Sequence, residues 1–452
     1  MSVLRFLFLF VGFCVSAADW PTYRADASRS GVSPEQLAMP LKQTWVHQPL
    51  HAPRPAWRGP AKRDLYNDKL NDLKNRQLFD HAFHVIADAK SVYFGSSSDD
   101  QVHCLDGKTG KERWTFFTEG PVRLAPTLSA GKLFVGSDDG HAYCISTEGK
   151  QIWRQRLAPS DYRIAGNNRI ISAWPVRTGI LVRDGVAYAG AGMFPSEGVH
   201  IVAFSAADGK ERWRETRRDL PAQGYLLVSD TRVYVPAGRS NPVVFNRADG
   251  KHIRTASGGG GTYALLSGGD LVSGPGKTGQ LGLMREGVPD VFANFSGNHM
   301  IVFAEKAYLH ADKVLSVLDR VRYLKLQGEL KLVVKRREEL GKLLPQLRKQ
   351  KSPDAPKVQE ELNVTGRRLT EITTAKKACF LWRVDCAQPH SLILAGNTLF
   401  AGGNDEVAAY STIDRKQIWT AKVNGAALGL AVAHGRLLVS TDKGAIHCFT
   451  AK

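Results

Sequence analysis

Short apolar runs alternate with Gly, Asp and Ser turns along most of the chain, and the pattern returns after about forty residues. Each copy holds an apolar strand, a polar turn, a second apolar strand and then Gly-Lys-x-x-Trp or a variant of it. A unit of this kind cannot bury its own apolar face and must stack on its neighbours, so the pattern predicts a propeller or a solenoid. The fullest copies span residues 92–114, 133–153 and 186–213, and weaker copies span 233–254, 399–419 and 437–449.

The spacing of the strands predicts an all-β, eight-bladed β-propeller over residues 42–452. One unit, at 262–292, lacks the Gly-Lys-x-x-Trp phrase, so seven blades remain an alternative. The last copy ends without a fourth strand, whereas KQTWVHQ at 42–48 carries Trp45 where other copies carry their Trp. This N-terminal strand is therefore expected to complete the last blade and close the ring. The expected blades are 84–114, 124–153, 171–213, 225–254, 262–292, 299–382, 391–419 and 428–452.

The recurring glycines and tryptophans have a structural interpretation. The glycine of each Gly-Lys turn can adopt a positive φ in a tight hairpin, and a neighbouring Asp or Thr can bond the turn backbone. The tryptophan that follows is expected to wedge between neighbouring blades, where it buries on the order of 200 Å². We therefore interpret these tryptophans as structural residues and not as ligand stackers. The residues are Gly110, Gly149, Gly209 and Gly250, and Trp114, Trp153, Trp213, Trp382 and Trp419.

Two segments depart from the strand pattern. Residues 19–41 contain Pro and Ser breakers without a strand period and are expected to form an extended arm. Residues 310–378 carry apolar positions at alternating three and four spacing around a KSPDAPK breaker, which predicts an antiparallel helical hairpin inserted in blade six. Residues 311–378 include 17 Lys and Arg against 9 Asp and Glu. This basic surface is a candidate docking face for an anionic or protein partner, and a merely solvated face is the alternative.

The first residues have the pattern of a signal peptide. MSVLR is a short basic region, FLFLFVGFCV is apolar, and SAA is a small-residue cleavage site. Residues 1–18 are therefore expected to be removed by a cut between Ala18 and Asp19, which predicts a periplasmic or secreted protein. The loss of Arg5 lowers the formal net charge from +18 to +17. No later apolar run approaches the about 20 residues that a membrane-spanning helix needs.

The chain has six cysteines, of which Cys14 lies in the signal peptide. Three of the others occupy the same position of the repeat and are expected to be small buried hydrophobic residues. Cys379 and Cys386 bracket FLWRVD, and a disulfide between them is left open. The absence of CxxC and CxxCH argues against structural zinc and attached haem. The three equivalent cysteines are Cys104, Cys144 and Cys448.

Candidate ligand-binding residues come from the segments that enter the first strand of each blade. In this topology these segments converge on one mouth of the central channel, where propellers bind ligands. Guanidinium groups and flat aromatic rings suit a planar or sugar-like ligand that bears carboxylates or phosphates. Alternatively, the arginines bond carbonyls between blades and the aromatic side chains fill the channel. The candidates are Arg123, Trp174, Arg177, Tyr225, Tyr263, His390 and Asn424.

Two pairs of acids, Asp99-Asp100 and Asp138-Asp139, occupy equivalent turns beside histidines. A metal site is one interpretation of such pairs. Because they recur with the repeat, turn chemistry explains them better. No Ser-His-Asp arrangement or nucleophilic cysteine stands out, so no catalytic residue is assigned.

The repeat with its terminal Gly-Lys-x-x-Trp resembles the quinoprotein-like superfamily of eight-bladed propellers, built from pyrroloquinoline-quinone (PQQ) repeats. The opening DWPTYR at 19–24 and the phrases GPVRLAP, ISAWPVRTG and QGYLL look most similar to secreted PQQ-like propeller proteins of planctomycete-type bacteria. The resemblance covers most of the chain. It implies the fold, but the superfamily includes both periplasmic dehydrogenases and a non-enzymatic outer-membrane assembly lipoprotein.

The sequence departs from the enzymes of that superfamily. Quinoprotein alcohol dehydrogenases carry adjacent cysteines over the quinone and a Ca²⁺ site beside a catalytic Asp, and neither is recognisable here. We therefore expect an exported, non-catalytic binding or scaffolding protein for an anionic or polymeric ligand and a protein partner, without nucleic acid. One alternative is a divergent dehydrogenase that binds PQQ with Ca²⁺ through Arg123, Arg177 and Trp174. Another is a scaffold like the outer-membrane assembly factor, which would bind client β-strands at a blade edge.

Overall fold

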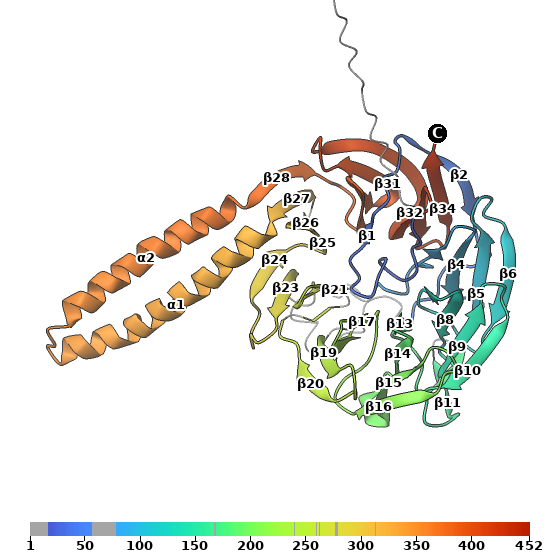
Figure 1. The fold of residues 1–452 in the computed structure, drawn as a ribbon, viewed down its shortest axis with the longest axis horizontal. Coiled ribbons are helices and arrows are strands. Elements are labelled where there is room, and N and C mark those ends of the chain that lie inside the picture. The colour runs from blue at the N-terminus through green and yellow to red at the C-terminus, as the bar shows by residue number, and fades with distance from the viewer. Residues whose placement is uncertain are drawn as a thin grey trace, which may run out of the picture.

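Small antiparallel sheets stand around a central channel, and a helical hairpin projects from the rim of this ring (Figure 1). The all-β propeller expected from the sequence is confirmed. The computed structural model describes residues 17–56, 78–166, 169–238, 240–258, 260–261, 263–275, 279–311 and 313–452.

Six of the sheets formed by the described residues have four strands each, joined in chain order. The second strand of most sheets is a nearly continuous apolar run that is buried on both faces, as in VYFG and LFVG. The fourth strand mixes charged and aromatic residues and faces solvent, as in ERWTFF and QIWRQR. Burial therefore decreases outward from the channel.

The first three of these sheets consist of β3 (Ile86–Ala87), β4 (Ser91–Ser96), β5 (Gln101–Asp106) and β6 (Glu112–Phe117); β7 (Thr127–Ser129), β8 (Lys132–Gly136), β9 (His141–Ser146) and β10 (Gln151–Arg156); and β13 (Leu181–Arg183), β14 (Val186–Ala191), β15 (Val199–Ser205) and β16 (Glu211–Arg217). The other three consist of β17 (Leu227–Val228), β18 (Arg232–Ala237), β19 (Ser240–Asn246) and β20 (His252–Thr255); β21 (Tyr263–Ser267), β22 (Asp270–Gly274), β23 (Gln280–Arg285) and β24 (Ala293–Ser296); and β25 (His299–Phe303), β26 (Lys306–Ala311), β27 (Val314–Asp319) and β28 (Phe380–Asp385). A separate two-stranded hairpin and a short 3-10 helix lie in connecting loops: β11 (Arg163–Gly166), β12 (Arg169–Ser172) and η1 (Pro195–Glu197).

The remaining strands form an eight-stranded sheet that contains both ends of the ring. The long strand β32 pairs with β31 along its first half and with β33 along its second half, so it passes from one unit to the next. The N-terminal strand β2 pairs with β34 and places Trp45 opposite Cys448, which confirms it as the closing strand. Dividing the sheet at β32 gives a unit of β29, β30, β31 and the first half of β32, to which β1 of the arm adds in parallel, and a unit of the second half of β32 with β33, β34 and β2. With the six four-stranded sheets this makes eight units, and the prediction of eight rather than seven blades depends on that division. The strands are β1 (Val32–Ser33), β29 (Ser391–Ala395), β30 (Thr398–Gly402), β31 (Asn404–Ser411), β32 (Lys416–Ala433), β33 (Arg436–Thr441), β34 (Ile446–Ala451) and β2 (Leu41–His47).

The tryptophans of the repeat connect neighbouring units, as expected. Five of these indoles donate a hydrogen bond to a backbone carbonyl of the following unit, and the contact of Trp45 closes the circle. Gly110, for example, has φ +70°, and a Cβ there would lie 2.5 Å from Cε3 of Trp45, so both the turn and the indole require glycine. The Nε1 to O distances are 2.9 Å for Trp114–Thr147, 3.3 Å for Trp153–Ala206, 3.0 Å for Trp213–Arg247, 3.0 Å for Trp419–Leu41 and 3.2 Å for Trp45–Gly107.

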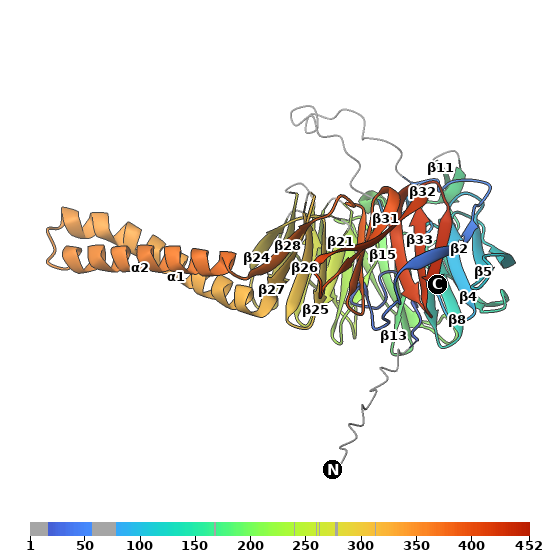
Figure 2. The ribbon, with the colours of Figure 1, turned by 90° about the horizontal axis from the view of Figure 1, so that it is seen from above.

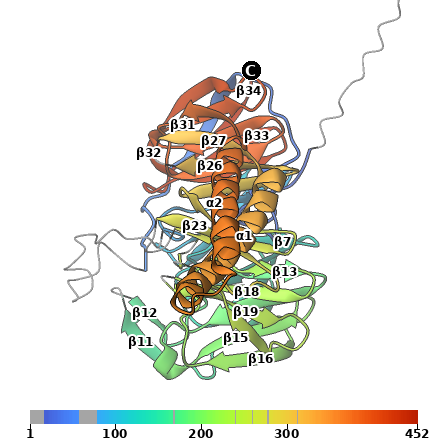
Figure 3. The same ribbon diagram turned by 90° about the vertical axis from the view of Figure 1, so that its left-hand side faces the viewer.

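The helical hairpin consists of α1 (Arg320–Lys349) and α2 (Ala355–Lys377), inserted between β27 and β28. It leaves the rim and projects well beyond the disc (Figure 2), and in Figure 3 it points toward the viewer. The expected start at residue 310 was wrong, because Lys306–Ala311 and Val314–Asp319 form strands β26 and β27, and the helix begins at Arg320. The apolar residues Val314 and Val317 fit either a strand or a helix spacing, and pairing with β28 decides for the strand. The side chain of Asp319 accepts a hydrogen bond from the Arg322 amide (3.0 Å) and so caps α1.

Two other expectations about local structure are also settled. The cysteines of the repeat position are fully buried, as predicted. Cys379 and Cys386 are free thiols in two different apolar clusters, so they do not form a disulfide. Neither helix of the described chain has the length and apolar character needed to cross a bilayer.

The segment 19–41, for which the sequence predicts an extended arm, packs inside the propeller. The segment lies in the central channel (Figure 1). Its backbone bonds to first strands around the ring, and Trp20 and Arg29 in it are each only 1% exposed. The arm is therefore part of the core of the propeller.

Candidate functional site

The channel has two distinct mouths. In an antiparallel meander the loop entering the first strand and the turn between the second and third strands lie at the same end. We call this end the entry mouth; it carries the loops with Arg123 and Arg177 and the turn with Asp138. The turns between first and second strands, such as His434–Gly435, mark the far mouth. The predicted site residues do not form one site. Some belong to a charged cluster, some line a cavity or contact the arm, and two lie elsewhere.

Arg123 and Arg177 meet at the carboxylate of Asp138, which is completely buried. Nε of Arg123 donates to Oδ2 (2.6 Å), and Nε and Nη2 of Arg177 donate to Oδ1 (2.9 Å) and Oδ2 (2.8 Å). Nη1 of Arg123 donates to the Arg54 carbonyl (2.6 Å), and Nη1 of Arg177 to Sδ of Met193 (2.8 Å). The two arginines therefore share one buried counter-ion within the protein.

The opposite charges of this cluster compensate one another although the groups are buried. Burial by itself raises the pKa of Asp138, but Arg123 and Arg177 outweigh that effect and hold the pKa below its ordinary value. A second carboxylate, Asp80, lies 3.6 Å from Arg123, and burial raises its pKa although Arg123 opposes the shift. Two guanidinium groups thus face two carboxylates. The interpretation of Asp138 as a turn residue alone was wrong, because its side chain joins two loops of the entry mouth.

The arm fills the channel from the far mouth. Its carbonyl groups accept hydrogen bonds from amides of four first strands, and Trp20 exchanges two backbone hydrogen bonds with Ala87 of β3. A compact turn between residues 22 and 31 brings Tyr23, Arg24 and Arg29 into the centre. The four bonds join Leu128 N to Pro21 O (2.7 Å), Val228 N to Ala27 O (3.1 Å), Leu266 N to Ser28 O (2.8 Å) and Leu394 N to Gly31 O (2.9 Å).

Arg29 is a buried cation held without a direct carboxylate partner among the described ion pairs. Its Nε donates to the Leu226 carbonyl (2.8 Å), and Nη1 donates to Oγ1 of Thr22 and the Tyr23 carbonyl (both 2.8 Å). Burial lowers its pKa to about 10. The guanidinium also lies 5.5 Å from the ring centroid of Tyr225, which stacks on Tyr23 at 3.6 Å. The predicted site residue Tyr225 therefore binds the protein's own arm.

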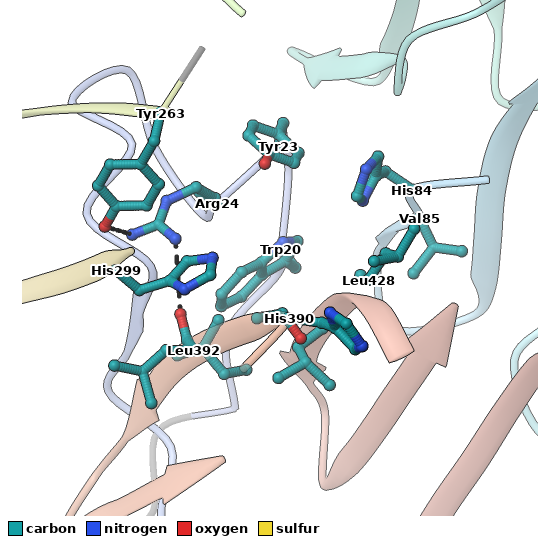
Figure 4. A pocket seen from close by; sticks show the side chains of 14 residues that line it. Trp20, Tyr23, Arg24, His84, Val85, Tyr263, His299, His390, Leu392 and Leu428 are labelled. Carbon is teal, nitrogen blue, oxygen red and sulfur yellow. Dashed lines mark hydrogen bonds between the residues drawn. The ribbon is translucent and has the colours of Figure 1, made fainter. Parts of the chain in front are cut away.

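A cavity of about 50 Å³ remains between the arm and the entry mouth (Figure 4). Arg24 lies in its wall and donates to Oη of Tyr263 (2.9 Å) and, at 3.5 Å, to the Leu392 carbonyl. Burial lowers the pKa of His84 to about 4 and that of His299 to about 3, so both imidazoles are neutral at neutral pH. The labelled lining residues are Trp20, Tyr23, Arg24, His84, Val85, Tyr263, His299, His390, Leu392 and Leu428.

Of the predicted site residues, only Tyr263 and His390 line this cavity. His390 bonds Oδ1 of Asn404 through Nε2 (2.6 Å). Trp174 donates from Nε1 to the Glu197 carbonyl (2.9 Å), and the Asn424 amide N–H bonds Nε2 of His447 (3.1 Å). Trp174 thus supports the loop that contains η1, the backbone of Asn424 contacts β34, and neither residue lines the cavity.

A family model described as outer membrane protein assembly factor BamB matches residues 54–173, 143–269 and 376–452. These matches cover most of the strands that surround the channel. The chain belongs to this family of PQQ-like repeat propellers. The resemblance inferred from the repeats is thereby confirmed, and the closer likeness to planctomycete-type proteins stays a prediction.

Individual relatives of this PQQ-like propeller include dehydrogenases. The 1-butanol dehydrogenase (cytochrome c) of Thauera butanivorans is 30% identical over 131 residues, a match covering 24% of this chain and 19% of that protein. The quinohemoprotein alcohol dehydrogenase of Comamonas testosteroni has a similar fold, with a TM-score of 0.58 at 13% identity over 96% of this chain and 80% of that one. A europium-containing methanol dehydrogenase gives 0.58 at 9% identity over 96% and 98%. These similarities establish the fold alone.

The described residues do not fit PQQ with Ca²⁺. Ligand pockets commonly enclose about 300–1,000 Å³, whereas the channel cavity is about 50 Å³. The guanidinium groups suited to the quinone carboxylates already bond Asp138, and the donors of Arg24 face Tyr263, Leu392 and Arg29. No group of three or more His, Cys, Asp or Glu side chains in the described chain could hold a metal ion.

Sequence reasoning missed the residues of the arm. Arg24 and Arg29 lie in a segment without strand or helix periodicity, so they were assigned to no site. The available signal was compositional, because Trp20, Tyr23 and two arginines within a short polar stretch are unusual for a solvent-exposed linker.

Proposed function

We propose that this PQQ-like propeller is an exported, non-catalytic binding protein whose helical hairpin docks an acidic protein partner. The observation that supports this most is the filled channel. The arm occupies the far half, and the arginines of the entry mouth bond Asp138. Among the described residues, the channel keeps a cavity of only about 50 Å³, which suits a rigid support for surfaces at the rim better than a ligand-binding ring.

The hairpin has the properties of a docking element. Sixteen Lys and Arg against seven Asp and Glu lie between residues 320 and 377. Only its base packs on the propeller, where Leu324 is buried among side chains of the fifth and sixth sheets. Val321, Leu332 and Leu343 of α1 are exposed and follow one another at intervals of eleven residues. Eleven residues are about three helical turns, so these side chains share one face. Exposed apolar side chains flanked by positive charge suit an acidic amphipathic partner.

The absence of quinone chemistry is tested by titrating the purified protein with PQQ and Ca²⁺ while following tryptophan fluorescence and quinone absorbance. We expect no saturable binding in the micromolar range. The matched variant Asp138→Asn frees Arg123 and Arg177 from their shared carboxylate. Tight binding by the unmodified protein that requires these two arginines would contradict the proposal and support a dehydrogenase.

The docking role is tested by placing a photo-crosslinking amino acid at Leu332 in cells that produce the full chain. Ile413, on the turn between β31 and β32, is the matched control, because Leu332 is 71% exposed and Ile413 is 69% exposed. We expect one discrete adduct from position 332 and none from 413. Reversing the charge of nearby arginines should abolish the adduct. Equal labelling from both positions would contradict a specific docking face.

A further inference from the structure

The buried carboxylate of Glu35, near the end of the arm, also binds the residues at which the arm begins. It is only 1% exposed, and it accepts hydrogen bonds from the amides of His434 (2.6 Å) and Gly435 (2.7 Å) in a turn at the far mouth. Its third donor is the backbone nitrogen of Ala18, at 2.6 Å from Oε1. Asp19, the next residue, pairs with His434 (2.7 Å). The beginning and end of the arm therefore meet at one carboxylate.

Among the described residues Glu35 has no side-chain counter-ion in direct contact, and the buried cation Arg436 interacts with it only at longer range. Its three hydrogen-bond donors are all backbone nitrogens. Within the described part of the chain, no Lys, Arg or His side chain forms an ion pair with it. A buried carboxylate that is hydrogen-bonded but not neutralised is costly. An α-ammonium group at Ala18 would supply the missing charge at the atom that already contacts Oε1. The 2.6 Å distance suits a short, charge-assisted hydrogen bond.

The cleavage-site pattern permits this ammonium group. A cut after Ala18 places Ser16 and Ala18 at the third and first positions before the cut, and a cut after Ala17 places Val15 and Ala17 there. Small or short apolar residues stand at both positions in either case, so the pattern does not choose between the two cuts.

We infer that the signal peptide is removed between Ala17 and Ala18, and that the new α-ammonium group of Ala18 pairs with Glu35 to lock the arm in the channel. One water molecule is consumed: the peptide C–N bond breaks, Ala17 leaves as a carboxylate on the signal peptide, and Ala18 gains the amino group. This inference rests on the proposed export and moves the expected cut by one residue. Removal of the signal peptide then also creates the charged group that fixes the arm in the core of the propeller.

The first test determines the N-terminus. The full chain is expressed with its leader in an exporting bacterium, and the protein from the envelope fraction is measured by intact mass and N-terminal sequencing. Ala18 as the first residue supports the inference. Asp19 as the first residue overturns it and leaves export intact. A protein that retains its leader in the cytoplasm contradicts the proposed export as well, so the two failures are distinguishable.

The second test concerns the ion pair. Glu35→Gln is compared with the unmodified protein in two forms, one beginning at Ala18 and one at Asp19, by thermal unfolding between pH 7 and pH 10. Pairing raises the pKa of the α-ammonium above its usual value of about 7.7–8.0, so its contribution is present at pH 7 and lost as the pH rises. The destabilisation by Glu35→Gln should shrink at least twofold across this range in the Ala18 form alone. The other charged and titratable groups that face this pair are Asp19, His434 and Arg436. Equal losses at both pH values in both forms would overturn the pairing.

Discussion

Replacing Asp138 with Asn should show whether the arginines of the entry mouth are structural. Asn keeps the shape and one acceptor oxygen, but it removes the charge that Arg123 and Arg177 share. The remaining carboxylate, Asp80, lies 3.6 Å from Arg123. Breaking a buried ion pair on one side typically costs about 3–5 kcal/mol. With Asp80 still present, we expect a loss of about 3 kcal/mol in the free energy of unfolding, measured by urea at pH 7.

Asp184→Asn is the matched control. Its carboxylate also faces two arginines, Arg247 at 2.7 Å and Arg183 at 3.7 Å, but its side chain is 69% exposed. Exposed pairs contribute about 0–1 kcal/mol, so this variant should be close to the unmodified protein. Because the pKa of Asp138 is lowered in the folded protein, its contribution is present above about pH 3.9 and is lost as the pH falls through the folded value. Equal losses for the two variants would refute the reasoning that burial makes the Asp138 cluster important.

Three further variants test the ring, the arm and the cavity. Gly110→Ala should lose about 1–3 kcal/mol more in urea than Gly131→Ala, because both glycines have φ near +70° but only the first has Trp45 in the way. Arg29→Met should cost about 1–3 kcal/mol for each carbonyl left without a donor and should raise amide exchange throughout the arm; unchanged exchange would contradict the arm's dependence on this cation. His299 is buried neutral with its pKa lowered to about 3, so its contribution is full above about pH 6.5 and falls on acidification; His299→Asn should lower the dependence of the melting temperature on pH between 6.5 and 4.

The repeat could be predicted from the sequence because its signals are local. A Gly-Lys turn followed by Trp encodes a positive φ and an indole at fixed positions, and the same spacing correctly predicted that Trp45 lies in the closing strand. The residue at which the helical hairpin begins could not be predicted in this way. Val314 and Val317 fit both a strand and a helix, and only the pairing of β27 with β28 across the whole insertion decides between them. Long-range pairing is not encoded in local periodicity.

The internal partner of the predicted arginines was hidden from the sequence for a related reason. Arg123 and Arg177 were placed at the entry mouth by topology, and they are there, but their ligand is a side chain of the protein. Asp138 lies in a different loop from either arginine. Its place in a recurring turn already accounted for the residue, so the sequence did not point to an ion-pair partner for its side chain. A carboxylate and two guanidinium groups can satisfy one another wherever the fold brings their loops together. The presence of such residues at a channel mouth therefore does not by itself indicate a ligand.

The arm shows how a polar segment without periodicity can belong to a core. The first strand of each sheet has one edge toward the channel, and its amides need acceptors there. The carbonyls of Pro21, Ala27, Ser28 and Gly31 provide acceptors on four sheets, each at a different angle around the ring. A strand or helix of regular period could not serve four edges that point inward from different directions, whereas an irregular turn can. Because the channel is filled in this way, we expect recognition to take place on the outer surface, where the hairpin is the largest projection.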